Sequence, residues 1–182
     1  MQFQRGDRYS RGAIAFHWAI AALVLFNLWL GLFHASLPRD WQVMPVHKSV
    51  GVTVLVLTLG RIAWRLTHRP PHLPDAMPHS EKIAAKTAHL ALYALLLILP
   101  LTGWLLSSNP ERPRPIEWFF LFKLPVLPAT PGIAGAAHQA HELLGLVMTA
   151  LVAVHIAAAV RHHFLLRDRV LARMLPWAAR RD

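Results

Sequence analysis

Four apolar stretches, each long enough to cross a lipid bilayer as a helix, constrain the fold of this chain more than any other feature. They cover about residues 13–33, 46–66, 84–107 and 137–160. A helix rises about 1.5 Å per residue, so about 20 residues cross a hydrocarbon core about 30 Å thick. The chain is 55% hydrophobic, above the roughly 45–50% of soluble domains. We therefore expect residues 1–182 to form one integral-membrane domain of the all-α class.

Lys and Arg residues are distributed unevenly around these stretches, and their distribution predicts how the chain crosses the bilayer. Of the 19 Lys and Arg residues, 14 lie in the N-terminal arm, in the loop after the second stretch and in the tail, with the adjoining stretch ends included. Because cytoplasmic loops carry the excess of positive charge, we expect an antiparallel four-helix transmembrane bundle with both termini in the cytoplasm. The formal net charge of +10 is then explained by topology and contact with membrane lipid, without a nucleic-acid partner.

The same reasoning predicts a multi-pass protein of the bacterial inner membrane, with the two sparsely charged loops in the periplasm. The first stretch lacks a clear small-residue cleavage site, so we expect it to remain a span. Pro38 and Pro45 act as helix breakers in the shorter periplasmic loop. The longer loop, 109–131, carries six prolines and the aromatic run Trp118-Phe119-Phe120, a pattern that predicts a segment at the lipid–water interface.

Four histidines inside the apolar stretches fall at two matching depths. His141 and His155 are fourteen residues apart, a rise of about 21 Å that returns both side chains to nearly the same helix face. In the predicted topology, His17 shares the cytoplasmic depth of His155, and His47 shares the periplasmic depth of His141. An ionisable residue inside the membrane indicates a functional site. We therefore expect two sites, each built from two facing imidazoles.

The composition restricts what such imidazole pairs can bind. The chain has no cysteine, which excludes disulfides, iron–sulfur clusters, thiolate metal sites and covalent attachment of c-type haem. A structural zinc site needs four ligands, whereas haem iron needs only two axial ligands from the protein. Two axial histidines leave no vacant position on the iron, which favours electron transfer over oxygen binding. The sequence thus predicts two haems that are not covalently attached.

Other histidines leave alternatives open. His138 is the rival of His141, because it lies three residues earlier on the same helix face. His34 is a weaker rival of His17, since 17 residues turn it off that face by about 100°. His89 lies near the cytoplasmic face, where it could line the inner haem pocket or a quinone site, or have a purely structural role.

Charged and polar residues near the two depths are candidates for the haem periphery. Arginine offers two parallel donors to a carboxylate such as a haem propionate. The candidate propionate partners, each of which could instead be a topology anchor, are Lys48, Arg61, Arg65 and Arg161. Glu142 lies beside His141 and could form an ion pair with Lys48. His162 and His163 end the fourth stretch, either as headgroup anchors or as a lining for the inner haem edge or a quinone headgroup.

Several short motifs occur in order along nearly the whole chain. They are Ala15-Phe16-His17-Trp18, Val46-His47-Lys48-Ser49 with Gly51, Arg61 to Arg65, Pro70-Pro71, Ala88-His89 to Tyr93 with Pro100 and Gly103, His141-Glu142, His155-Ile156-Ala157-Ala158-Ala159, His162-His163-Phe164 and Leu175-Pro176. In order and spacing the chain resembles bacterial cytochrome b561, a family of small four-span di-haem b proteins of the inner membrane.

The resemblance implies a ligand set and a class of activity. His17 and His155 would ligate one haem, and His47 and His141 the other, with electron exchange between the protein and ubiquinone or ubiquinol. Some family members resemble superoxide oxidases, which pass an electron from superoxide at the periplasmic haem to ubiquinone. The sequence leaves open whether the chain is an electron carrier, such a superoxide:ubiquinone oxidoreductase, or the cytochrome b anchor subunit of a larger dehydrogenase or hydrogenase. A metal-ion transporter that uses its histidines is a further alternative, and the oligomeric state is not predicted.

Overall fold

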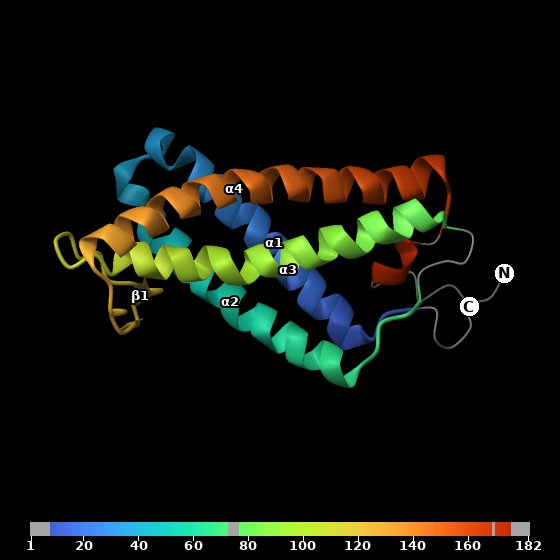
Figure 1. Ribbon diagram of the computed structural model, residues 1–182, viewed down its shortest axis with the longest axis horizontal. Helices are drawn as coiled ribbons and strands as arrows, with labels where there is room; N and C mark the ends of the chain where they lie inside the picture. The colour runs from blue at the N-terminus through green and yellow to red at the C-terminus, as the bar shows by residue number, and fades with distance from the viewer. Residues whose placement is uncertain (1–7, 73–76, 169, 176–182) are drawn as a thin grey trace.

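The computed structural model describes residues 8–72, 77–168 and 170–175. Within these residues, four long α-helices form a bundle, as the sequence predicted (Figure 1). They are α1 (Arg11–Phe33), α2 (Val43–Thr67), α3 (His79–Ser107) and α4 (Pro131–Val160). Each helix contains its expected apolar stretch in full. Five residues used in the sequence reasoning lie outside the described part of the chain: Arg5, Arg169, Pro176, Arg180 and Arg181.

All four helices begin before their apolar stretches, and polar side chains cap the starts of α1 and α4. The hydroxyl of Ser10 accepts a hydrogen bond from the backbone N–H of Ala13 at the start of α1 (3.3 Å). Thr130 caps α4 in the same way, with Pro131 at the first helical position, where its missing N–H costs nothing. Pro45, expected to break the chain before the second helix, instead lies in the first turn of α2, where an N–H has no intrahelical partner.

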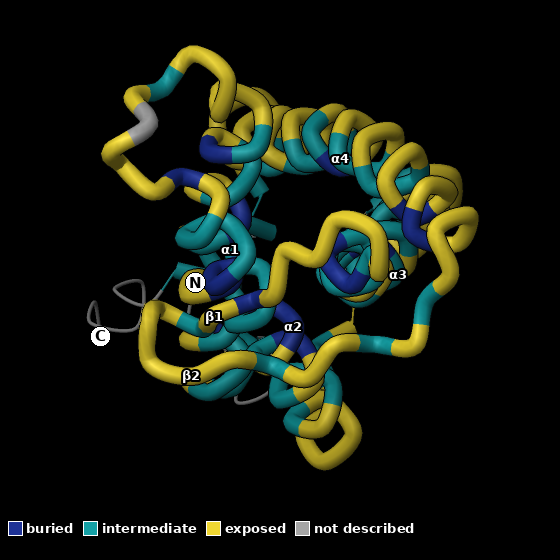
Figure 2. Tube along the Cα trace, turned by 90° about the vertical axis from the view of Figure 1, so that its left-hand side faces the viewer, coloured by how far each residue is buried: buried dark blue, intermediate teal, exposed yellow. Residues whose placement is uncertain are grey.

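The most extensive packing joins consecutive helices, α1 with α2, α2 with α3 and α3 with α4. Figure 1 shows α3 and α4 side by side along the long axis, with α1 and α2 inclined to them. Figure 2 views the bundle from one end, with the buried positions facing its interior. The central buried cluster draws on all four helices: Ile20, Val24, Val50, Val54, Leu95 and Met148.

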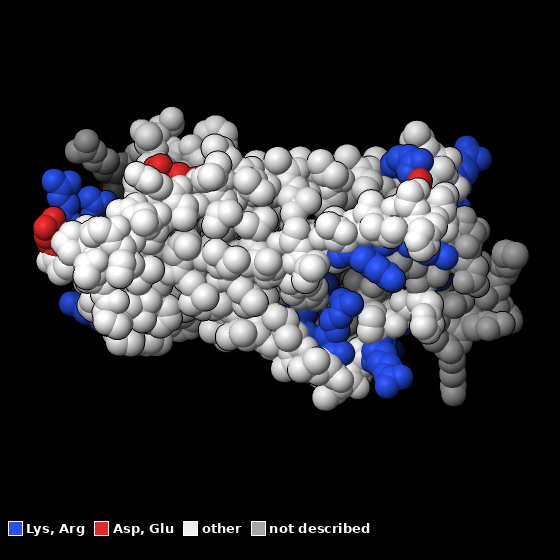
Figure 3. Space-filling view, viewed as in Figure 1, with Lys and Arg blue, Asp and Glu red and all other residues white. Residues whose placement is uncertain are grey.

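The outer surface of the bundle is apolar. Leu90 of α3 and Leu143 of α4 are 73% and 64% exposed, and all four helices are long and apolar enough to cross a membrane. Charged side chains gather toward the two ends of the face shown in Figure 3, with an uncharged band between them. Large exposed apolar surfaces are unfavourable in water, so this band fits contact with lipid.

The two ends of the bundle differ. At the hairpin end, the loop after α3 forms a small antiparallel hairpin of β1 (Glu117–Trp118) and β2 (Phe122–Lys123), which the sequence did not predict. At the tail end, a π-helical turn, η3 (Arg161–Leu165), extends α4, and the tail folds back through the 3-10 turn η4 (Ala172–Met174). Arg8 donates a hydrogen bond to the carbonyl of Leu175 (2.6 Å). The first and last described residues, Arg8 and Leu175, therefore both lie at the tail end.

Candidate functional site

Three histidines from three helices meet at the tail-end level. His17 of α1 and His155 of α4 face each other with ring centroids 6.3 Å apart and ring planes at 76°. His89 of α3 lies on another side of His155, with centroids 5.6 Å apart. The structure therefore brings the predicted pair together and adds His89 to it, while the predicted alternative His34 lies at the opposite end of α1.

Two histidines meet at the hairpin-end level. His47 of α2 and His141 of α4 have ring centroids 6.1 Å apart, and their planes are nearly perpendicular, at 83°. His138 does not take part: its Nε2 lies 3.6 Å from Oε1 of Glu142, and both side chains are more than half exposed. The structure thus places His141, not His138, against His47.

The spacing of both predicted pairs fits one metal ion held between two imidazoles. A metal–imidazole bond is about 2 Å long. A five-membered ring with bonds of about 1.35 Å places each nitrogen about 1.15 Å from the ring centre, so two opposed ligand rings have centres about 6.3 Å apart. His89 lies closer to His155 than this spacing. Among the described residues no group of three or more His, Cys, Asp or Glu is placed to hold a metal ion.

Hydrogen bonds at Nδ1 orient the rings of the hairpin-end pair. Nδ1 of His47 donates to the carbonyl of Asn27 (3.1 Å), and Nδ1 of His141 donates to the carbonyl of Leu99 (3.1 Å). A carbonyl only accepts, so Nδ1 carries the proton and Nε2 of a neutral ring keeps its lone pair. Metal-ligating histidines usually have this arrangement. The residues present therefore fit a bis-histidine haem.

The four basic candidates differ in how near they lie to the histidine levels. Arg61 Nη1 lies 3.0 Å from Nδ1 of His17, and the Cζ atoms of Arg61 and Arg65 lie 5.5 Å and 5.8 Å from the ring centre of Tyr93. Arg161 instead pairs with Glu81 at 3.2 Å. Arg61 is therefore the basic residue in direct contact with a predicted ligand.

The expected ion pair between Lys48 and Glu142 is not formed. Lys48 Nζ donates to the carbonyl of Arg114 in the loop before the hairpin (2.8 Å), and Glu142 faces His138. The prediction was wrong because the sequence did not show that the loop after α3 lies over the start of α2 and offers Lys48 a carbonyl.

His162 belongs to a polar cluster at the tail end. Its Nδ1 contacts Asp168, its Nε2 lies 4.0 Å from Glu81, and its side chain is mostly buried. His163 is exposed and packs against Phe164. The sequence reasoning missed the two carboxylates, because Glu81 falls before the third apolar stretch and Asp168 after the fourth.

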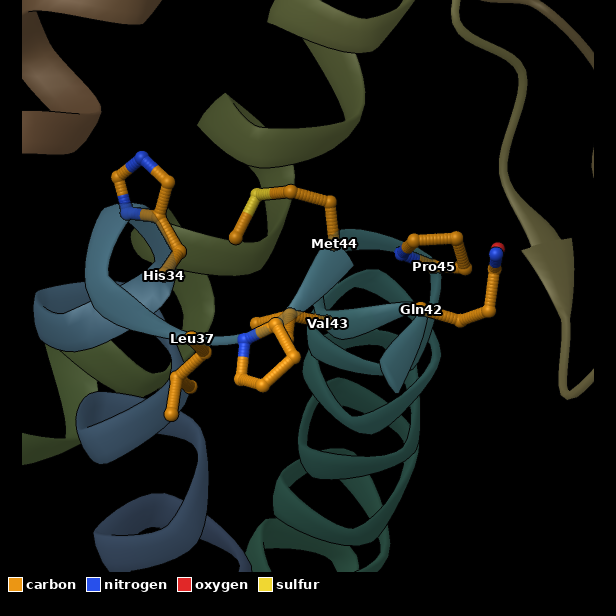
Figure 4. A pocket seen from close by; sticks show the side chains of 7 residues that line it. His34, Leu37, Gln42, Val43, Met44 and Pro45 are labelled. Atoms are coloured by element: carbon orange, nitrogen blue, oxygen red, sulfur yellow. The ribbon is translucent and has the colours of Figure 1, made fainter. Parts of the chain in front are cut away.

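A pocket of about 220 Å³ opens at the hairpin end, between the 3-10 turn η1 (His34–Ser36), which follows α1, and the first turn of α2 (Figure 4). Its lining residues are His34, Leu37, Pro38, Gln42, Val43, Met44 and Pro45. Nδ1 of His34 donates a hydrogen bond to the carbonyl of Gly31 (2.8 Å). A side chain added at Gly31 would contact the ring of His47. The pocket therefore adjoins the hairpin-end pair through Gly31.

An apolar four-helix bundle with imidazole pairs at two depths defines a membrane protein of the b-cytochrome class. The family model for prokaryotic cytochrome b561 matches residues 8–177. The chain belongs to the prokaryotic cytochrome b561 family, a family of membrane cytochromes, which implies haem b as the cofactor.

Curated relatives match almost the whole chain. "Cytochrome b561 homolog 2" of Escherichia coli (strain K12) is 34% identical over 175 residues, covering 93% of this chain and 92% of the relative. "Cytochrome b562" of Cereibacter sphaeroides is 30% identical and covers 92% and 94%. "Probable superoxide oxidase CybB" of Yersinia pestis is 29% identical and covers 93% and 96%. The resemblance seen in the sequence is confirmed, and the protein is a multi-pass protein of the bacterial inner membrane.

Proposed function

We propose that the chain holds two non-covalent b haems, one between His17 and His155 and one between His47 and His141, and carries electrons between the two faces of the membrane. The observation that carries the proposal is that α4 supplies one histidine to each level. His141 and His155 lie in one continuous helix, about 21 Å apart along its axis. Each faces a second imidazole from another helix at the spacing of a shared metal ion.

The two levels would face opposite sides of the membrane. The excess of Lys and Arg at the tail end supports a cytoplasmic tail end and a periplasmic hairpin end. Haem supplies one-electron redox chemistry when bound. The four histidines would hold the two haems, and the chain orients their rings and surrounds them with apolar helices.

At the tail end the acceptor in this proposal is ubiquinone, which takes up two electrons and two protons. His89, His162 and His163 are the candidate polar residues for its site or for the haem edge. Arg61, Arg65 and Arg161 are the candidate basic residues at this level, and Lys48 is the candidate at the other.

A small periplasmic donor would enter at the hairpin end. The relative named as a probable superoxide oxidase supports superoxide as that donor. Two superoxide ions would then give two electrons and leave two molecules of O₂, and one ubiquinone would become ubiquinol after taking up two protons.

Purified protein tests the proposal directly. We expect two haems per chain and a split α-band in the reduced-minus-oxidised spectrum. We also expect reduction of a water-soluble ubiquinone analogue when superoxide is generated. A colourless protein would refute the haem proposal. Haem content without this activity, together with co-purification of a large soluble dehydrogenase or hydrogenase, would instead identify an anchor subunit.

A further inference from the structure

The His47 ring lies in a socket on the neighbouring helix α1. Its Nδ1 donates to the carbonyl of Asn27 (3.1 Å), and one turn further along α1 its Cε1 faces Gly31. A Cβ atom added at Gly31 would lie 3.1 Å from that Cε1. A contact this short would displace the ring by a few tenths of an ångström, so the missing side chain of Gly31 is what lets the ring approach the helix.

The His141 ring lies in a second socket of the same design on α3. Its Nδ1 contacts the carbonyl of Leu99 and the hydroxyl of Thr102, both at 3.1 Å. A Cβ atom added at Gly103 would lie 3.1 Å from its Cε1. In both sockets the carbonyl and the glycine are four residues apart, which is about one helical turn.

The tail-end level is built differently. Nδ1 of His17 contacts the side chain of Arg61 rather than a backbone carbonyl. The glycines nearest this level, Gly12 and Gly60, face Trp64 and Phe16 instead of an imidazole. Among the described residues, glycines adjoin imidazole rings only at the hairpin end.

We propose that Gly31 and Gly103 are positioning residues, which with the carbonyls of Asn27 and Leu99 hold the rings of His47 and His141 in nearly perpendicular planes. The inference rests on the proposed haem between these two rings. Two fixed points on the edge of a ring, Nδ1 and Cε1, determine its rotation about the Cβ–Cγ bond. Backbone atoms of a packed helix provide more rigid points than a flexible side chain does.

The ring planes matter because they set the electronic character of a bound haem. Perpendicular axial imidazoles leave two iron d orbitals nearly equal in energy, which spreads the EPR signal of low-spin ferric haem and raises its largest g value. A hydrogen bond from Nδ1 to a carbonyl makes the ligand more basic, which favours ferric over ferrous iron. The sockets therefore predict a strongly anisotropic hairpin-end haem with a potential lowered by its ligands.

EPR of the full-length oxidised protein in detergent, with two haems bound, tests the inference. Displacing either ring changes the angle between the two planes, which is 83°, so Gly31→Ala and Gly103→Ala should each shift the largest g value of one of two low-spin signals. The midpoint potential of that haem should rise, because the Nδ1 contact lengthens. Gly135→Ala is the matched control, since it is exposed on α4, six residues turn it off the face of His141, and an added Cβ meets nothing within 4 Å. It should leave both signals unchanged.

Unchanged signals in Gly31→Ala and Gly103→Ala would overturn the inference, as would an equal shift in Gly135→Ala. Where one alanine variant binds neither haem, the other carries the test, and an unmoved signal in it would overturn the inference. Absence of low-spin haem in the unmodified protein would instead refute the proposed function.

Discussion

Nδ1 of His17 lies 3.0 Å from Nη1 of Arg61. A guanidinium group only donates, so in this contact Nδ1 accepts and the proton of the neutral ring is on Nε2. A histidine that binds iron through Nε2 carries its proton on Nδ1. The contact therefore cannot persist when His17 is a ligand, and Arg61 must turn to another acceptor, such as a haem propionate.

A charge this close to the tail-end level should tune its potential. Reduction removes one positive charge from the iron, so a nearby cation stabilises the reduced form. We expect Arg61→Gln to lower the midpoint potential of the tail-end haem by an amount on the order of tens of millivolts, measured by redox titration. Lys123→Gln is the control, because Lys123 is exposed and lies in β2 at the hairpin end of the bundle. A potential that stays the same or rises in Arg61→Gln would contradict this role.

The ligand assignment at the hairpin end can be tested by a matched pair of variants. We expect His141→Ala to lose one haem and keep the other, because the ring of His47 then has no opposed imidazole. His138→Ala should keep both, since His138 is exposed and contacts Glu142. Haem content and reduced-minus-oxidised spectra measure the outcome. Two haems in His141→Ala with one in His138→Ala would transfer the ligand role to His138.

The helices and the depth of each histidine could be predicted because both depend on spacing along one chain. Apolar length fixes where a helix can cross a membrane, and fourteen residues fix the separation of His141 and His155. The order of loops then matches His17 with His155. The pairing of His17 with His155 could be predicted without the loop conformations, because four crossings of the membrane already fix the order of the residues by depth.

The sockets and the hairpin could not be predicted, because they depend on contacts between helices and loops. The sequence does not show that the backbone carbonyl of Leu99 accepts a hydrogen bond from a histidine. Gly103 could equally have made room for a macrocycle. Gly145 faces open space, and a side chain at Gly51 would meet Asn27 rather than an imidazole.

Ser49 fixes the hairpin to α2, and its loss should release the hairpin. Ser49 is 1% exposed, and its hydroxyl accepts from the N–H of Phe119 (2.9 Å) and lies 3.1 Å from the carbonyl of Glu117. Phe119 and Phe120 have φ values of 45° and 63°, which bulky residues adopt only when other contacts hold them. Ser49→Ala should weaken this local structure by about 1–2 kcal/mol.

Hydrogen–deuterium exchange over residues 117–123 measures the effect of Ser49→Ala. The amides of the hairpin should exchange several-fold faster, while those of the helices should be unaffected. Thr149→Ala is the control, because the Thr149 hydroxyl donates to the carbonyl of Gly145 in its own helix (2.8 Å). Equal exchange of the hairpin in Ser49→Ala and the unmodified protein would show that other contacts hold it.

Gly12 lets α1 pack against α2 at the tail end, and a methyl group there should destabilise the bundle. A Cβ atom at Gly12 would lie 2.4 Å from Cζ2 of Trp64. Trp64 cannot easily move, because its Nε1 donates to the hydroxyl of Ser10 (2.9 Å). Its ring also stacks on the ring of His68, with ring centroids 4.1 Å apart. Moving it would also weaken the cap of α1, since the same hydroxyl accepts from Ala13. We expect Gly12→Ala to cost about 1–3 kcal/mol.

Thermal unfolding in detergent, followed by far-UV circular dichroism, measures the cost of Gly12→Ala. Gly135→Ala provides the comparison, because it makes the same chemical change at an exposed position of α4 where an added Cβ meets nothing within 4 Å. Alanine is the better helix former by about 1 kcal/mol, so Gly135→Ala should keep or raise the midpoint temperature. Gly12→Ala should lower it, because the clash with Trp64 outweighs the same gain in propensity. Equal midpoints in the two variants would mean that Trp64 moves aside freely, and that the contact between Gly12 and Trp64 does not hold α1 to α2.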